Sequence, residues 1–99
     1  MFKGIICRVR TAVVLAQKND PSLLSHVEKG AVFQKNKKTL GPLLSCVKDS
    51  ANEDKACEPY LFGLLGSMND VMPEVKNLQT KLGVSYQRAV KKKCAAPSQ

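Results

Sequence analysis

Apolar residues recur every three or four positions over the first eighteen residues, the spacing that places side chains along one side of an α-helix. The cations of this stretch lie off that stripe, and no acidic residue occurs before Asp20. The pattern predicts a basic amphipathic helix. Its apolar positions are Phe2, Ile5, Ile6, Val9, Ala12, Val13 and Ala16, and its cations are Lys3, Arg8, Arg10 and Lys18.

A second helix is expected to begin at Asp20 and Pro21. Asp20 can accept hydrogen bonds from the free amides of a helix start, and proline suits the first helical position. Gly30 lies in the middle of this helix and weakens it by about 1 kcal/mol relative to alanine, which suggests a close helix contact there. The apolar side comprises Leu23, Leu24, Val27, Ala31 and Phe33, and the lysines near the carbonyl end are Lys35, Lys37 and Lys38.

Prolines mark the expected helix boundaries in the rest of the chain. Pro42 is expected to end the second helix and to precede a short one that fades near Lys48, followed by an exposed polar loop over 50–54. The next helix is expected near Pro59, and Pro73 opens the last helix, which reaches 91–93 before a frayed tail over 95–99. The apolar sides are Leu43, Leu44 and Val47, then Tyr60, Leu61, Leu64, Leu65 and Met68, then Val75, Leu78, Leu82, Tyr86, Ala89 and Val90.

No sustained alternation of apolar and polar residues and no hairpin dipeptide competes with these helices. A chain of 99 residues has room for one modest core. We therefore predict a single all-α domain over 1–99, a small bundle of three longer helices plus one or two short ones.

Charge is distributed unevenly along the chain, whose formal net charge is +8. Residues 1–48 carry +7 (9 − 2), residues 49–74 carry −5 (1 − 6) and residues 75–99 carry +6 (6 − 0). An acidic middle can neutralise part of its basic flanks, so a nucleic-acid-binding role is less favoured than the net charge alone suggests.

The apolar runs are far shorter than the roughly 20 residues that cross a bilayer, so no transmembrane segment is expected. The basic, acid-free start is similar to a mitochondrial targeting element. Because this stretch also has the pattern of a packed helix, we expect an uncleaved internal signal and a mitochondrial location, in the matrix or on the matrix face of the inner membrane.

Side chains that could support chemistry are few. His26 is the only histidine, it has no clear nucleophile partner, and no glycine-rich phosphate loop is present. The four cysteines are widely spaced, which disfavours a zinc site. Free thiols in a reducing compartment are favoured over nested disulfides that join Cys7 to Cys94 and Cys46 to Cys57. No enzymatic activity, metal or cofactor is predicted.

The triplet Ile6-Cys7-Arg8, followed 25 residues after Arg8 (33 − 8) by Phe33 in a basic run, resembles a degenerate form of the LYR-motif family of small mitochondrial proteins. That family carries Leu-Tyr-Arg on its first helix. Here Ile6 replaces leucine, Cys7 departs from tyrosine and Arg8 matches arginine. The resemblance covers residues 5–42 at most.

The resemblance implies a three-helix bundle that docks an acidic acyl carrier protein, receives its acyl chain and helps to assemble respiratory or iron–sulfur complexes. The expected function is therefore a non-catalytic accessory or adaptor subunit of a mitochondrial complex. An RNA-binding protein, such as a mitochondrial ribosome component, is the alternative, although aromatic residues do not alternate with the basic ones. Peripheral attachment of the first helix to a membrane surface is a third hypothesis.

A short connection favours antiparallel first and second helices, which would return the end of the second helix to the start of the first. The cations of both segments would then form one patch for an acidic partner, with an apolar anchor beside them. The predicted partner-binding residues are Arg8, Arg10, Phe33, Lys35, Lys37 and Lys38.

Overall fold

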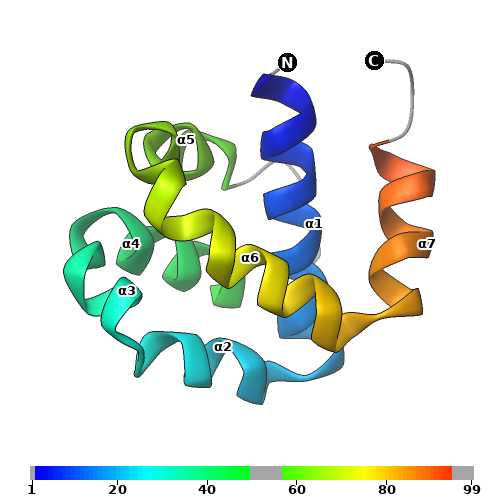
Figure 1. Cartoon of the computed structure of the whole chain (residues 1–99), viewed down its shortest axis with the longest axis horizontal. Coiled ribbons are helices and arrows are strands. Elements are labelled where there is room, and N and C mark those ends of the chain that lie inside the picture. The colour runs from blue at the N-terminus through cyan, green and yellow to red at the C-terminus, as the bar shows by residue number, and fades with distance from the viewer. Residues whose placement is uncertain (1, 50–56, 95–99) are drawn as a thin grey trace.

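The computed structural model describes residues 2–49 and 57–94, and their side chains from Gly4 onward (Figure 1). The described residues form helices and no strand, so the predicted all-α bundle is confirmed. The loop expected over 50–54 and the tail over 95–99 lie outside the described residues. The elements are α1 (Phe2–Asn19), α2 (Pro21–Glu28), α3 (Ala31–Lys35), α4 (Lys37–Asp49), α5 (Glu58–Phe62), the 3₁₀-helix η1 (Gly63–Ser67), α6 (Met68–Leu82) and α7 (Val84–Lys93).

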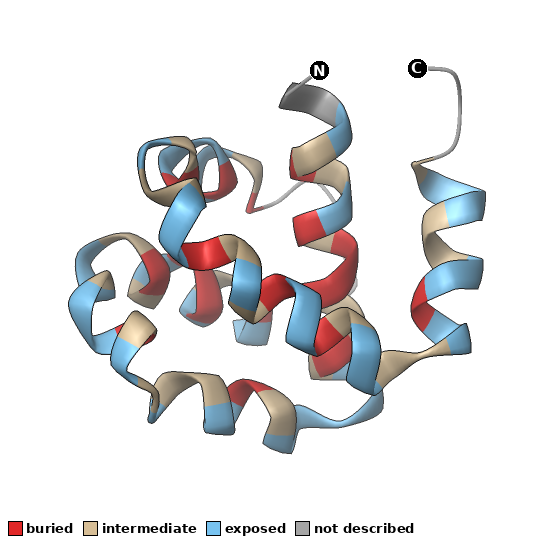
Figure 2. Cartoon of the chain, in the orientation of Figure 1, coloured by how far each residue is buried: buried red, intermediate tan, exposed pale blue. Residues whose placement is uncertain are grey.

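Helix α1 is the central element of the bundle. It packs against α2, α4, α5, α6 and α7, and Figure 2 shows buried positions along much of its length. The apolar stripe predicted for it is buried from Ile6 to Ala16, and Ile5 is partly buried. Ala12 and Ala16 are completely buried, and such small side chains allow neighbouring helices to approach the α1 backbone closely.

The second predicted helix is divided among α2, α3 and the start of α4, because the chain leaves helical geometry at Gly30 and again at Asn36. The backbone of Gly30 is extended, with φ −81° and ψ 161°. The Gln34 side chain donates a hydrogen bond to the carbonyl oxygen of Glu28, at 2.9 Å, and so satisfies an acceptor left open at the end of α2. A β-carbon at Gly30 would lie 3.3 Å from the Val27 carbonyl oxygen. The close approach at Gly30 is therefore to its own chain and not to another helix.

Pro42 and Pro73 do not break helices, contrary to the sequence prediction. Each is the sixth residue of its helix, α4 or α6, so its ring displaces the hydrogen bond to the carbonyl of the second residue. Those second residues, Lys38 and Asn69, are exposed, as are both prolines, so water can hydrate the freed carbonyl groups. The cost of each proline is thereby reduced, and the apolar faces of α4 and α6 continue across it.

The long final helix predicted from the apolar spacing is interrupted at Gly83. This residue has φ +58° and ψ −129°, a conformation that side-chain-bearing residues rarely adopt. Its amide still donates to the Gln79 carbonyl oxygen at 2.9 Å, which closes α6 before the chain turns into α7. The change of direction leaves α7 packed on α1 and α6.

The buried core is aliphatic, as the composition predicts, and is drawn from every helix (Figure 2). Two assigned core positions are wrong: Tyr60 is 45% exposed, and Ala31 is exposed. Leu61 occupies the buried side of α5 instead, which turns Tyr60 outward. The core residues are Ile6, Val9, Ala12, Val13, Ala16, Leu24, Phe33, Leu40, Leu43, Leu44, Val47, Cys57, Leu61, Leu64, Val71, Val75, Leu78 and Tyr86.

The four cysteines form two disulfides, so the prediction of free thiols is wrong and the nested alternative is found. Cys7 is joined to Cys94 and Cys46 to Cys57. The Cα–Cα distance is 5.8 Å in both, within the usual range for a disulfide. Wide spacing in the sequence did not reveal the pairing because antiparallel packing of α1 and α7 brings residues 87 positions apart together.

Phe33 is 5% exposed, and we expect Phe33→Ala to lower the free energy of unfolding by about 3 to 5 kcal/mol through lost burial and a cavity. Phe62, which is 46% exposed, provides the matched control, since Phe62→Ala should cost about 1 kcal/mol or less. Urea denaturation of both variants measures the difference. Equal losses would contradict the burial assigned to Phe33.

Gly83→Ala should lower the free energy of unfolding by about 1 to 3 kcal/mol, because alanine is strained at a positive φ. Gly4→Ala is the control: a β-carbon there meets nothing within 4 Å, and alanine favours the α1 helix by up to about 1 kcal/mol. The prediction fails in a thermal or urea denaturation experiment if both substitutions stabilise the protein.

Candidate binding surfaces

The predicted partner-binding residues do not form one patch. Phe33 is buried in the core and cannot act as a surface anchor. Arg10 donates to the Glu58 carboxylate of α5 at 3.1 Å, and Lys35 lies 3.5 Å from the Asp70 carboxylate of α6. Because the chain turns at Gly30, α3 lies apart from the N-terminal half of α1 (Figure 1), and the expected return of the lysine cluster to Arg8 does not occur.

Lys37 and Lys38 are exposed at the start of α4, away from Arg8. Arg8 is also exposed, and its neighbour across the helix interface is α7, whose Tyr86 hydroxyl is within electrostatic range of the Arg8 guanidinium. The predicted residues therefore divide between two surfaces, and only Arg8 remains beside a second cationic helix.

The whole formal charge of the protein is carried by α1 and α7. These two helices contain eight of the sixteen Lys and Arg residues and none of the eight Asp and Glu residues, a charge of +8 (8 − 0). The rest of the chain is balanced (8 − 8 = 0). The two helices pack together, with the first turn of α1 and the last turn of α7 at the same end of the molecule (Figure 1). We call the exposed residues Arg8, Arg88, Lys91 and Lys92 the cationic face.

Tyr86 holds the base of α7 at the junction with α1 and α6. It is 8% exposed. Burial raises the pKa of its hydroxyl above the ordinary value of 10.0, while Arg8 and a hydrogen bond with Gln79 oppose the rise. The neutral phenol is thus the form that this junction accommodates.

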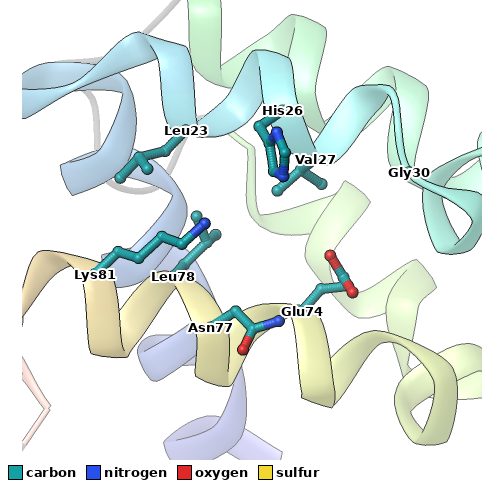
Figure 3. Close-up of a pocket in the computed structure, with 8 residues that line it drawn as sticks. All are labelled: Leu23, His26, Val27, Gly30, Glu74, Asn77, Leu78 and Lys81. Carbon is teal, nitrogen blue, oxygen red and sulfur yellow. The ribbon is translucent and has the colours of Figure 1, made fainter.

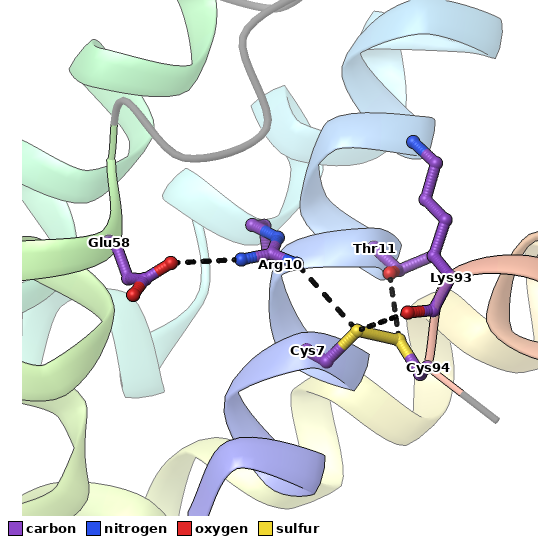
Figure 4. Close-up of polar contacts among 6 residues, drawn as sticks. All are labelled: Cys7, Arg10, Thr11, Glu58, Lys93 and Cys94. Carbon is purple, nitrogen blue, oxygen red and sulfur yellow. Dashed lines mark hydrogen bonds and ion pairs between the residues drawn. A yellow bond between two sulfur atoms is a disulfide. The ribbon is translucent and has the colours of Figure 1, made fainter. Parts of the chain in front are cut away.

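The Cys7–Cys94 disulfide closes the other end of the same helix pair (Figure 4). The Thr11 hydroxyl is 3.4 Å from the Cys94 sulfur and, since a disulfide has no thiol proton, it must be the donor. Arg10 donates from Nη2 to the Cys7 sulfur at 3.7 Å while Nη1 binds Glu58. The carbonyl oxygen of Lys93 is 3.6 Å from the Cys7 sulfur. Buried and half-buried polar groups therefore surround a covalent joint between two cationic helices.

A separate cleft of about 250 Å³ lies between α2 and α6 (Figure 3). Leu23, Val27 and Leu78 give it an apolar wall, and His26 and Glu74 point toward the space from opposite helices. No lining residue is a serine, threonine or cysteine, so the cleft offers no hydroxyl or thiol for His26 to activate. The other lining residues are Gly30, Asn77 and Lys81.

Within residues 2–49 and 57–94, no group of three or more His, Cys, Asp or Glu side chains is arranged to hold a metal ion. No helix in these two ranges is both long and apolar enough to cross a membrane, as the sequence predicted. Comparison with known proteins gives no matching family model, no matching curated protein and no matching solved structure.

The cationic face was missed in the sequence although each of its parts was visible there. The basic start and the lysine run 91–93 are more than 70 residues apart (91 − 18 = 73), and nothing in the spacing showed that α7 packs on α1. Pairing of Cys7 with Cys94 is the signal that places these segments together, and it requires the two outer cysteines to be taken as partners.

We expect the free energy of unfolding to fall as the pH rises above 10, because the folded state holds the Tyr86 proton more tightly than the unfolded state does. Below that pH both states are protonated and Tyr86 adds no pH dependence. Tyr86→Phe should reduce the alkaline slope, measured by urea denaturation of the variant and the natural protein on both sides of pH 10. Identical slopes in the two proteins would refute this role for Tyr86.

Proposed function

We propose that this protein is a non-catalytic accessory or adaptor subunit that binds an acidic protein partner through the cationic face. The observation that carries the proposal is the presence of four exposed cations, those of the cationic face, on two adjacent, covalently joined helices that contain no acidic residue. A solvated, evenly charged surface would not need such separation. Long-range attraction to this face would steer an acidic partner into one orientation.

The chemistry of the described residues supports a binding role. The only histidine lines a cleft without a hydroxyl or thiol nucleophile. Glu58, the acid that contacts α1, is paired with Arg10 and leaves Arg8 exposed. Individual contacts between exposed charges contribute about 0.2 to 1 kcal/mol, so affinity would come from several of them acting together.

An acyl carrier protein is one acidic partner that fits this proposal, and Arg8, which matches the arginine of the LYR triplet, belongs to the cationic face. Membership of that family, a place in a respiratory complex and a mitochondrial location are all part of the proposal. Disulfides persist in oxidising compartments. The pairing of all four cysteines therefore favours the intermembrane space over the matrix, where the resemblance implies that an acyl carrier protein would be bound. The proposal is therefore for an acidic protein partner in general, with acyl carrier protein as its probe.

The test compares two triple charge reversals that change the net charge equally. Arg8→Glu, Arg88→Glu and Lys91→Glu remove the cationic face, whereas Lys37→Glu, Lys38→Glu and Lys76→Glu alter exposed lysines elsewhere. With purified acyl carrier protein as the acidic probe, the first triple should slow association at least about tenfold, and the second about threefold or less. Stopped-flow measurement at low salt gives the rates, and circular dichroism checks folding.

Equal slowing by the two triples would show that net charge alone matters and would overturn the proposed site. A protein that binds single-stranded RNA at low salt but not the acidic probe would favour the RNA-binding alternative. The two triple variants carry the same net charge. RNA binding that is lost in the first variant and kept in the second would therefore be distinguishable from non-specific attraction.

A further inference from the structure

The Cys7–Cys94 disulfide has an asymmetric environment. Arg10 donates to the Cys7 sulfur from Nη2, at 3.7 Å, while its other terminal nitrogen is held by Glu58 (Figure 4). We propose that this disulfide is a thiol–disulfide exchange site: a dithiol attacks the Cys94 sulfur, Cys7 leaves as a thiolate, and α7 is released from α1.

The direction of attack follows from which sulfur better carries negative charge. The Arg10 guanidinium donor stabilises negative charge on the Cys7 sulfur, and charge-assisted hydrogen bonds are roughly twice as strong as neutral ones. Among the described side chains, the hydrogen bond found at the Cys94 sulfur comes from the neutral Thr11 hydroxyl, at 3.4 Å. Cys94 also follows the carbonyl end of α7, where the helix dipole disfavours an anion. The sulfur whose negative charge is better stabilised leaves faster, so Cys7 is the leaving group.

The exchange is balanced as a two-electron transfer. The thiolate of the dithiol forms a bond to the Cys94 sulfur as the Cys7–Cys94 bond breaks, and the electron pair of that bond goes to Cys7. The second thiol of the reagent then displaces Cys94 and forms the reagent's own disulfide. The protein gains two thiols, after protonation of both sulfurs, and the dithiol is oxidised.

The second disulfide lacks these features. Cys57 is 4% exposed, so a reagent can reach this disulfide only at the half-buried Cys46 sulfur. Among the described side chains, no hydrogen bond or ion pair to a cation is found at Cys46 or Cys57. Exchange at Cys46–Cys57 should therefore be slow, which makes the two disulfides chemically distinct within one small domain.

Release of α7 follows from the small number of buried residues that pack it on the bundle. Tyr86 is its one buried residue among those described, with Ala89 and Val90 partly exposed. α1 and α7 each carry four cations and no acid, so they repel once the covalent joint opens. Exchange would therefore dismantle the cationic face; as regulation of partner binding this consequence rests on the proposed function, whereas the exchange chemistry does not.

Timed reduction of the folded protein by dithiothreitol, alkylation and peptide mass spectrometry test the proposal without any partner. Cys7 and Cys94 should be alkylated at least about tenfold faster than Cys46 and Cys57. After this selective reduction, amides of α7 should exchange hydrogen faster while those of α4 and α6 do not. Equal reduction of the two disulfides would overturn the exchange site, and unchanged protection of α7 would overturn its release.

The role of Arg10 is tested by the position at which a monothiol is trapped. Glutathione should form its mixed disulfide on Cys94 in the natural protein. Arg10→Gln and Glu58→Gln both remove the ion pair, but only Arg10→Gln removes the cation at the Cys7 sulfur. The first variant should slow exchange and distribute glutathione over both cysteines, and the second should keep it on Cys94. Preferential trapping on Cys7, or the same loss of preference in both variants, would refute the role of Arg10.

Discussion

Packing of the other helices on α1 is the constraint on which this fold depends. Helices on several sides bury the apolar stripe from Ile6 to Ala16. The cations of α1 therefore lie on the small part of this helix that the other helices do not cover. Fully buried Ala12 and Ala16 let those helices come close, at the expense of the apolar area that larger side chains would bury. A chain of this size then has little further core with which to hold α7.

α7 packs beside α1, so two helices of the same charge lie together. The disulfide stabilises this arrangement, whereas electrostatic repulsion between the helices opposes it. Each like-charge contact between exposed groups costs a few tenths to about 1 kcal/mol, the magnitude of an exposed ion pair with its sign reversed. In the chain-entropy model, closing a loop as long as that between Cys7 and Cys94 stabilises the folded state by about 4 to 5 kcal/mol. The disulfide therefore outweighs several such repulsions, and the helix pair can keep its charge exposed.

Local signals in the sequence predict much of this fold. The spacing of α1 and the Asp20–Pro21 start of α2 were both correct, because each depends on residues within one or two turns. The breaks at Gly30 and Gly83 were missed, and breaks were wrongly placed at Pro42 and Pro73. Glycine interrupts a helix only when the surrounding packing requires an extended or positive-φ backbone, and proline is tolerated where solvent reaches the freed carbonyl. Neither condition is visible in the residue itself.

The predicted binding residues could not be assigned correctly from local signals, because their availability depends on tertiary contacts. The sequence identifies Arg10 and Lys35 as cations. In the fold, Glu58 and Asp70 reach them from other helices and neutralise them. Arg8 and Arg88 have no acid on their own helices, and the disulfide keeps those two helices together. Whether a cation is available to bind a partner thus depends on which carboxylates from distant parts of the chain the fold brings to it. Only tertiary contacts, such as the Cys7–Cys94 disulfide, determine which carboxylates those are.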